Sequence, residues 1–425
     1  MRHLLSRRLG GRSLKESYWA FNEVWARVAR LRGASSRDFR RLVIADQLQF
    51  IRGGVQPVRG ESRQRAELAQ SWLLTAQKAT PDSGVSLGYF PHREEGSPWL
   101  PSYPETTGYI IQSLIDYSLQ YDSIQSRIRA LEMAQWESEV QMASGAVQGG
   151  PLCSPERQAP AVFNTGMVLQ GYCSVLTIVS DERVLDAAHR AARFLVQDLG
   201  DDGHFRTHGP FVLAATIKTY NVLCAWALYR FGERSGNQAY IHAAIRSAEA
   251  AMGQQQENGW FAHNDLTNPE MPLTHTIGYT LQGILEVGVL AGREDMIAAV
   301  RLGLDPVLRQ MKPSGFLAGR FFSDWRAASF SSCLTGSAQL AIVALRLFEI
   351  TGEPSYRLAG DRLLNYLKGL QRTTDPDLNV NGALSGSFPL LLGSYMSGGF
   401  PNWASKYLLD GLMLQDRLTG TLSSS

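Results

Sequence analysis

Apolar positions along this chain recur with the period of an α-helix, and the helical segments alternate between two kinds. The first kind is apolar nearly all round and carries a glycine near its start. Four segments share this glycine and the apolar run that follows it: ETTGYIIQSL (105–114), FNTGMVLQGY (163–172), HTIGYTLQGI (275–284) and CLTGSAQLAI (333–342). Three of them have a glutamine four residues after the glycine. A helix that is apolar on every side is buried, so we expect helices that start at these glycines and form an inner layer.

Two further segments fit the same register. IKTYNVLCAW (217–226) has Tyr220 at the glycine position, and PNWASKYLLDGL (401–412) fits more loosely with Lys406 there. The six register positions are 108, 166, 220, 278, 336 and 406. They are separated by 58, 54, 58, 58 and 70 residues. A recurring period of this kind indicates stacked supersecondary units that cannot bury their apolar faces alone.

The second kind of helix is amphipathic and precedes each inner helix. Its sequence has small and apolar residues, then a glutamine, then a step from glycine to an aromatic or apolar residue. Examples occupy 66–90, 187–205, 243–261, 299–317 and 357–371, whereas the copy near 127–148 is less clear. Six inner and six outer helices predict an all-α fold, an (α/α)6 toroid of six helical hairpins. The closed ring is favoured over an open solenoid because the inner helices are apolar all round.

The connections between the helices differ in length. Turns from inner to outer helices are short, whereas those from outer to inner helices have roughly 15–35 residues and meet on one rim. Long ordered loops in a compact domain are usually functional. Five of the 8 histidines lie on them: His92, His204, His208, His263 and His275. We therefore place the site in the mouth of the ring on this rim.

Composition adds a basic N-terminal region. The first 60 residues hold 13 Lys and Arg against 4 Asp and Glu, whereas the whole chain of 425 residues has a net charge of +2. We expect a basic helical extension over 1–61, the toroid over 62–418 and a flexible tail over 419–425. The extension could be a solvated lead-in, a transit-like segment, or a contact for a partner or a membrane surface. We expect no nucleic-acid partner, secretory signal or transmembrane segment; the oligomeric state stays open.

The chain has four cysteines, Cys153, Cys173, Cys224 and Cys333, and no CxxC pair. Three of them lie in apolar helical patterns, where free cysteine behaves as a small hydrophobic residue. This usage predicts a reducing compartment, the cytoplasm, with no disulfide framework. We expect no cofactor and no metal site.

The paired helices with a glutamine-to-glycine-aromatic step and a Thr-Gly…Leu-Gln inner helix, as in HTIGYTLQG, resemble the six-hairpin, (α/α)6-toroid superfamily of carbohydrate-active enzymes. That superfamily includes unsaturated glucuronyl hydrolases, N-acylglucosamine 2-epimerases, polysaccharide lyases and the helical domain of D-glucuronyl C5-epimerase. The resemblance covers about 62–418 and implies the toroid fold and a glycan substrate. No catalytic signature of one family is present. The same glutamine step also resembles triterpene cyclases, but their Asp-rich acid motif is absent.

Acid–base chemistry needs carboxyl, imidazole or phenol groups near the mouth. Glu105 lies at the start of an inner helix, whose N-terminus would hold it ionised. The segment QQQENGWFAHNDLTNPEMPLTHTIGYTLQG (254–283) adds two histidines, His263 and His275, a residue type that can move protons. The predicted catalytic residues are Glu105, His263, His275, Tyr279 and Asp324. Asp324 stands beside arginine, which would lower its pKa, and an internal salt bridge is the alternative.

Aromatic and basic residues near the mouth could bind a sugar. The predicted substrate-binding residues are Tyr103, Tyr109, Arg157, Asn164, Arg206, His208, Trp260, Asn264, Arg320, Trp325, Arg326, Asn402, Trp403 and Lys406. For some of them a structural role is an open alternative: Asn164 could cap its helix, and Trp260 could plug the base of a hairpin. Arginine forks bind carboxylates in a bidentate manner, so basic residues that converge on the mouth favour an anionic ligand, a uronate.

These residues predict an enzyme that acts on a uronate-containing glycan by proton abstraction, as a lyase or an epimerase. A glycoside hydrolase with paired carboxylates is the nearest alternative. A non-catalytic toroid that binds a glycan or serves as a scaffold in polysaccharide biosynthesis is the second alternative. It would use the basic extension as its contact.

Overall fold

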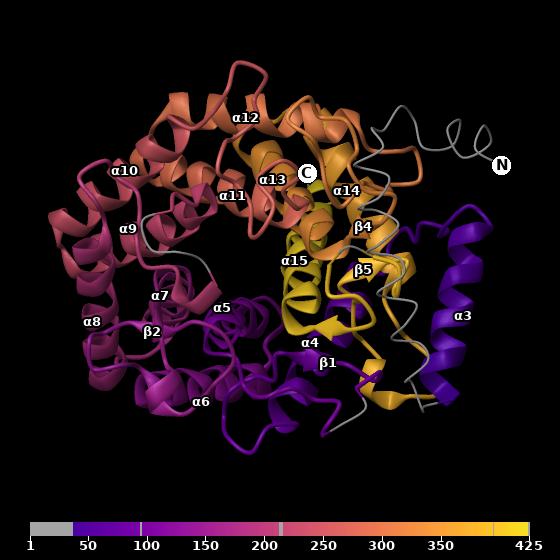
Figure 1. The fold of residues 1–425 in the computed structure, drawn as a ribbon, viewed down its shortest axis with the longest axis horizontal. Coiled ribbons are helices and arrows are strands. Elements are labelled where there is room, and N and C mark those ends of the chain that lie inside the picture. The colour runs from indigo at the N-terminus through magenta and orange to yellow at the C-terminus, as the bar shows by residue number, and fades with distance from the viewer. Residues whose placement is uncertain (1–36, 94–95, 212–215, 394, 424–425) are drawn as a thin grey trace.

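In the part of the chain that the structure describes, six inner and six outer helices surround a common axis (Figure 1). The computed structural model describes residues 37–93, 96–211, 216–393 and 395–423. The inner helices are α5 (Pro104–Tyr121), α7 (Val162–Ile178), α9 (Leu223–Ser235), α11 (Thr274–Ala291), α13 (Leu334–Thr351) and α15 (Asn402–Ser423). The outer helices are α4 (Ser62–Lys78), α6 (Ile124–Val140), α8 (Glu182–Asp198), α10 (Gln238–Met252), α12 (Glu294–Arg309) and α14 (Pro354–Leu370). The predicted all-α fold is confirmed.

The inner helices close a ring. Each one packs against the next along the chain, and the last inner helix, α15, packs against the first, α5, and against α4. The strand pair β1 (Gly88–Tyr89) and β6 (Phe400–Pro401) joins the first and last long connections in the same way. The predicted toroid is therefore a closed ring of six hairpins rather than an open solenoid.

The repeated glycines lie inside the first turns of the inner helices, not at their starts as we expected. Their role is close packing between neighbouring inner helices. A Cβ atom on Gly108 would lie 2.6 Å from the Val168 Cα, and one on Gly166 would lie 2.5 Å from the Cys224 Sγ. A Cβ on Gly336 would meet the His275 backbone nitrogen at 2.5 Å. Glycine at these positions lets the backbones of adjacent inner helices approach more closely than any other residue would.

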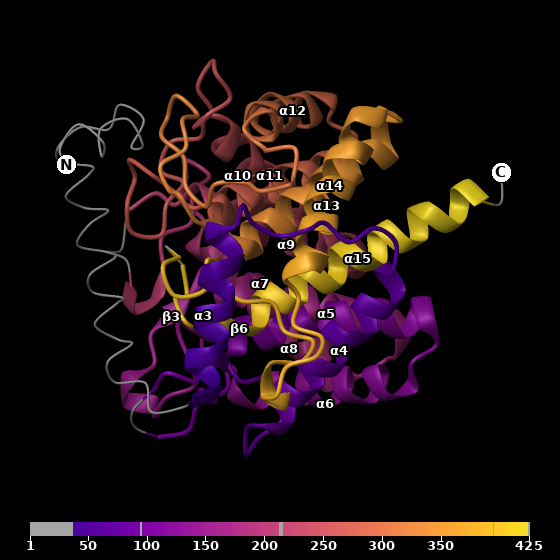
Figure 2. The same cartoon turned by 90° about the vertical axis from the view of Figure 1, so that its right-hand side faces the viewer.

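The long connections lie on one rim, and the end of α15 leaves the ring on the opposite side (Figure 2). They carry short antiparallel strand pairs. Besides β1 and β6, these are β2 (Val147–Gln148) with β3 (Pro160–Ala161), and β4 (Ser332–Cys333) with β5 (Ser387–Phe388). The short turns lie at the other ends of the inner helices, where Gly236, Gly292 and Gly352 adopt positive φ as helix C-caps. The predicted asymmetry of the two rims is confirmed.

The extension packs on the last long connections through α3 (Arg37–Ile51). Phe50 contacts the Phe388 ring at a centroid distance of 5.6 Å. Asp46 on the same helix accepts a hydrogen bond from the Leu390 amide and pairs with Arg372. The first 36 residues, most of the predicted basic arm, lie outside the described residues. Helix α15 continues to Ser423, so 419–423 of the predicted tail are helical.

One described helix, α13, is long and apolar enough by length and composition to cross a membrane. It is an inner helix of the ring, and 72% of that segment is buried. Its apolar character has a structural cause, because inner helices pack on all sides. Cys173, Cys224 and Cys333 are buried and free, as expected of small apolar residues.

Candidate functional site

A carboxyl group and a phenol form the centre of the candidate site at the start of α5. Tyr103 is the N-cap residue of this helix, and Glu105 lies in its first turn after Pro104. The Tyr103 hydroxyl donates a hydrogen bond of 2.6 Å to Glu105 Oε2. Both side chains are half-buried, so they remain in contact with solvent. Such a pair can hold and transfer a proton.

The pKa of Glu105 is raised to about 7 because burial disfavours the charged carboxylate. The hydrogen bond from Tyr103 acts in the opposite direction and lowers it. The prediction that the helix N-terminus holds Glu105 ionised is therefore wrong, since burial outweighs the attraction of the helix end. A carboxyl group with this pKa exchanges its proton at neutral pH.

His275 lies opposite, in the first turn of α11 rather than on a loop as we expected. Its Nδ1 is 2.7 Å from Gln339 Oε1, so Nδ1 carries the proton and Nε2 is left as an acceptor. Burial lowers the pKa of His275 to about 4, which keeps the ring neutral. The ring lies 4.4 Å from Tyr279 and 5.2 Å from Tyr395 between centroids.

Tyrosines line the ring axis between these two groups. Tyr279 contacts the rings of Phe163, at 4.7 Å, and Tyr407, at 6.0 Å. Burial raises the pKa of Tyr279, Tyr109 and Tyr407 well above the usual value, so these phenols keep their protons. Such groups can donate hydrogen bonds to sugar oxygens and stack on sugar rings.

Lys406 is the buried cation of this region. Its Nζ lies 4.0 Å from the centroid of Tyr407 and 4.9 Å from that of Tyr109. It forms an ion pair of 2.7 Å with Asp410, one turn further along α15. The cation–π contacts and the ion pair together satisfy its charge, so Lys406 joins the tyrosine wall rather than the rim.

Two predicted binding residues, Asn164 and Asn402, tie connections to inner helices. The Asn164 amide donates to the Gln148 backbone oxygen at 2.7 Å, and the Asn402 amide donates to that of Ser86 at 2.8 Å. Burial and the neighbouring Glu105 raise the pKa of Tyr103 well above its usual value, and Asn164 acts in the opposite direction. Asn164 does not cap its helix, because Ala161 is the N-cap residue of α7. Trp403 contacts Tyr103 edge to face at 6.2 Å, which brings it to the same cluster.

The structure adds residues that the sequence did not single out for the site. They are Phe163, Tyr220, Gln339, Tyr395 and Tyr407. Tyr220 occupies a register position and Gln339 follows the register glycine of its helix, so the repeat itself could have indicated both. Tyr395 comes from the last long connection and carries no sequence signal.

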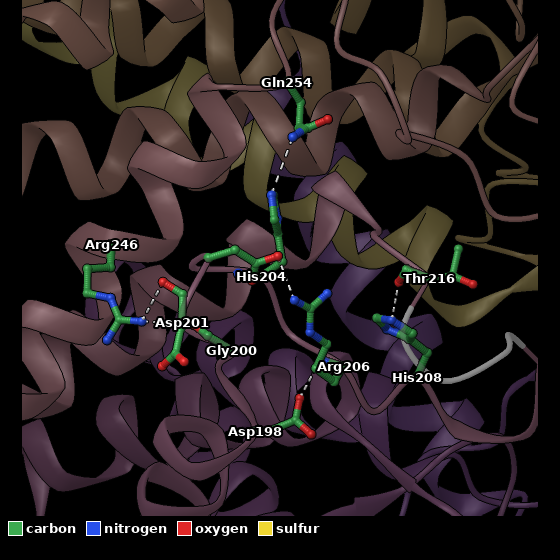
Figure 3. A network of polar contacts seen from close by, with 10 residues as sticks. Asp198, Gly200, Asp201, His204, Arg206, His208, Thr216, Arg246 and Gln254 are labelled. Carbon is green, nitrogen blue, oxygen red and sulfur yellow. Dashed lines mark hydrogen bonds and ion pairs between the residues drawn. The ribbon is translucent and has the colours of Figure 1, made fainter.

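The loop that carries Arg206 and His208 is held by its own polar network (Figure 3). Arg206 pairs with Asp202 at 2.5 Å, and its backbone amide donates to Asp198 at 2.7 Å. His208 Nε2 lies 2.6 Å from the Thr216 oxygen. Burial lowers the pKa of His208. These contacts bind both side chains within the loop and its neighbours.

Five other predicted residues lie in the connections before α11 and α13. Trp260 and Trp325 pack edge to face at 5.1 Å, and the Trp325 indole donates to the Asn258 oxygen. Arg320 donates to the Met271 oxygen. The exposed Asp324 pairs with Arg326 at 2.5 Å, which lowers the pKa of Asp324 as predicted. The contacts match the alternatives given above: Asp324 forms a salt bridge within the protein, and Trp260 packs at the base of its hairpin.

The polar residues of the segment 254–283 take separate places in the structure. His263 is exposed on a turn with positive φ, and Asp265 forms a buried ion pair of 2.8 Å with Lys218. Asn264 Oδ1 accepts a hydrogen bond from the Thr280 hydroxyl at 2.8 Å. Of this segment, His275 and Tyr279 alone join the described cluster around Glu105. Arg157 is exposed, and its Nε lies 3.3 Å from the Ser154 hydroxyl.

The predicted convergence of five basic residues on the mouth is wrong for the described contacts. Four of them, Arg157, Arg206, Arg320 and Arg326, bind groups of their own or neighbouring loops, and Lys406 pairs with Asp410 inside the ring. No group of three or more His, Cys, Asp or Glu among the described residues has the arrangement of a metal site.

The chain matches no protein-family model and no curated protein. Its fold is similar to that of an unsaturated glucuronyl hydrolase specific for heparin, with a TM-score of 0.68 and 14% identity over 85% of this chain and 99% of that one. An unsaturated glucuronyl hydrolase from Bacillus sp. GL1 gives 0.65 and 16% identity over 84% and 97%. Cellobiose 2-epimerase from Bacillus thermoamylovorans B4167 gives 0.66 and 10% identity over 83% and 98%. The resemblance to the six-hairpin toroids is thus confirmed at the level of the fold.

Proposed function

We propose that this chain is a carbohydrate-active enzyme that acts on a uronate-containing glycan by proton transfer, with Glu105 as the group that takes or gives the proton. The observation that carries the proposal is the pKa of Glu105, about 7, beside a protonated phenol at 2.6 Å. A general base or acid is most effective when its pKa lies near the working pH. The glycan substrates of the structurally similar enzymes support the substrate class.

In the proposed reaction the Glu105 carboxylate removes the proton from the sugar carbon next to the uronate carboxylate. The electron pair left on that carbon either expels the oxygen substituent at the adjacent carbon, as in a lyase, or takes a proton on the other face, as in an epimerase. Tyr103 and Tyr279, which keep their protons, can donate to the developing charge. Both outcomes use one base, and the structure supports both equally.

The helix ends favour an anionic ligand in place of the arginine clamp that we expected. Inner helices α5, α7, α11, α13 and α15 begin on the long-loop rim, where each presents the positive end of its dipole. A carboxylate gains from such ends without a pairing arginine. Because Glu105 is largely protonated below pH 7, it would repel a bound uronate only weakly.

A hydrolase with paired carboxylates is less well supported. Such enzymes place two carboxyl groups within about 10 Å of each other across the scissile bond. Burial and Tyr103 are the influences on the pKa of Glu105, and within the described part of the chain no second carboxylate contributes to it. We also propose a cytoplasmic location, for which the buried free cysteines are the support.

The test is incubation of the full chain with a panel of uronate oligosaccharides, with Glu105→Gln and Glu257→Gln as variants. Glu257 is an exposed carboxylate on the same rim and serves as the matched control. We expect ultraviolet absorbance from an unsaturated uronate, or incorporation of solvent deuterium, with wild type and Glu257→Gln. Loss of about 10²-fold or more in Glu105→Gln would match the removal of a general base. New reducing ends without either signal would favour a hydrolase, and no product on any glycan would favour a scaffold role.

A further inference from the structure

The opposite end of the ring axis holds a cavity of about 560 Å³ that opens on the rim with the short turns. It lies between the C-terminal halves of α5, α11, α13 and α15, with Trp226 of α9 at its side. Glu105 and His275 are not among its lining residues. The cavity therefore belongs to a different part of the ring from the site around Glu105.

The polar groups of the cavity that lack a partner are all acceptors. Gln282 is only 7% exposed, yet its Oε1 has no hydrogen-bond partner among the described residues. The same holds for Gln112 Oε1 and for Asp410 Oδ1. Buried polar atoms are normally paired, so three unpaired acceptors around one cavity indicate a ligand that supplies donors.

The two glutamines are the repeated residues of the inner helices, four positions after Gly108 and Gly278. The repeat places them at equivalent heights on α5 and α11, across the ring axis from one another. The repeat thus supplies the cavity with two amide oxygens from two separate hairpins.

The donors around the cavity are already engaged. Arg346 binds Glu286 through two nitrogens, at 2.9 and 3.0 Å, and binds Glu349 through the third at 2.7 Å. Arg417 also pairs with Glu349. These pairs neutralise Glu286. Asp410 binds Lys406 through Oδ2 and keeps Oδ1 without a partner, so Asp116 and this one oxygen of Asp410 are the carboxylate groups that can meet a ligand.

Asp116 is exposed to the cavity, where the like charge of Asp410 acts on it together with the cations Arg230 and Lys406. An ammonium group beside Asp116 would relieve the repulsion from Asp410 further. The Trp226 ring offers a face that already binds Arg230 at 5.6 Å, and part of the ring lines the cavity. Leu119, Ile342, Met413 and Leu414 give the cavity apolar walls. Carboxylates, free amide oxygens and an aromatic face together suit a nitrogen cation with an apolar stem.

We propose that this cavity is a second binding site, which takes a compact organic cation with a primary ammonium group. Its N–H donors pair with Gln112, Gln282 and Asp116, and its carbon stem packs on the apolar walls. A bare metal ion fits less well, because no described group of three or more His, Cys, Asp or Glu has the arrangement of a metal site. The size of the cavity admits a diamine or a similar small amine.

The test uses 1,4-diaminobutane as the probe and 1,4-butanediol as its uncharged counterpart, with binding to the full chain measured by titration calorimetry at low ionic strength. The variants are Asp116→Asn, Gln282→Met and Asp122→Asn. Asp122 is an exposed carboxylate at the end of the same helix and is the matched control. We expect saturable binding of the diamine at one site, no binding of the diol, and affinity at least tenfold weaker in the first two variants.

Equal affinity in Asp116→Asn and Asp122→Asn, equal binding of the diol, or no saturable binding of the diamine would each overturn the proposal. Thermal unfolding of each variant shows whether it is folded, and Asp116 is exposed, so its substitution leaves the core unchanged. The readout is binding and not turnover, so the outcome is independent of whether Glu105 is catalytic.

Discussion

The Tyr103 hydroxyl donates to the Glu105 carboxylate across 2.6 Å, at the start of one inner helix. The two residues are separated by one proline, so a single helix N-terminus positions both. The hydrogen bond stabilises the charged carboxylate, whereas burial stabilises the protonated acid. The balance between these effects determines the pH at which the proposed enzyme works.

Tyr103→Phe removes the hydrogen bond that lowers the pKa of Glu105, so that pKa should rise above about 7. If Glu105 is the base, kcat/KM increases with pH as Glu105 loses its proton. In the variant this increase moves to higher pH, and activity at pH 7 falls about tenfold. The measurement is the pH profile of kcat/KM for the variant beside wild type. A profile with an unchanged midpoint and a uniform loss of rate would mean that Tyr103 does not act through Glu105.

Glu105→Gln should flatten the dependence of stability on pH. The folded-state pKa of about 7 exceeds the ordinary carboxyl value of 4.5, so the folded protein binds the extra proton. The stability that this gives is fully present below pH 4.5 and is lost as the pH rises through 7. The variant should therefore be more stable than wild type at pH 8, by about 1–2 kcal/mol, since partial solvent contact reduces the full effect. Denaturant unfolding at pH 5 and pH 8 measures it, with Glu257→Gln as the control.

His275→Gln and His263→Gln separate the two histidines that the sequence suggested. Burial keeps His275 neutral, with a pKa of about 4 in the folded state, whereas the unfolded chain binds a proton below about 6.5. Stability from this group is present above pH 6.5 and is lost as the pH falls through 4. His275→Gln should therefore weaken the loss of stability on acidification, and it should lower activity. His263→Gln should change neither, and an equal effect of both variants would contradict this assignment.

The sequence predicted the ring and one part of the site for the same reason. The register glycines pack neighbouring inner helices together near the long-loop rim, so residues close to them in the chain, Glu105, Tyr109, His275 and Tyr279, lie near the axis. No such constraint applies to residues far from a register position. Tyr395 reaches the cluster from the last long connection, and no periodicity predicts the path of a loop.

The loop arginines pair with nearby carboxylates instead of converging on the mouth, and the spacing of these residues in the sequence explains why. Arg206 stands four residues after Asp202, and Arg326 stands two residues after Asp324. Partners this close in the chain lose little entropy when they pair, so local ion pairs form before contacts across the mouth. A count of basic residues on the rim therefore overstated the positive charge that a ligand would meet.

Among the polar contacts of the segment 254–283, the ion pair between Lys218 and Asp265 should lower stability most when one partner is removed. Both side chains are almost fully buried, at 7% and 6% exposed, with 2.8 Å between Nζ and Oδ2. Asp265→Ala leaves a buried ammonium without its partner and should cost about 3–5 kcal/mol of unfolding free energy. Lys218→Met combined with Asp265→Leu removes both charges and should cost much less. Urea unfolding of the three proteins measures this, and an equal cost for the single and double variants would contradict the pairing.

Gly336→Ala tests whether the repeated glycine serves packing between inner helices. An added Cβ would lie 2.2 Å from the Thr274 Oγ1 and 2.5 Å from the His275 backbone nitrogen, so the helix α13 must move away from α11. Overpacking of this kind costs about 1–3 kcal/mol. Gly420→Ala in α15 is the matched control, because nothing lies within 4 Å of its Cβ position. That change should be neutral or stabilise the helix by up to about 1 kcal/mol.

Because Gly336 abuts His275, its variant should also lower kcat at pH 7, while Gly420→Ala leaves kcat unchanged. Equal stability of the two variants would show that the inner helices tolerate a wider spacing than the repeat implies.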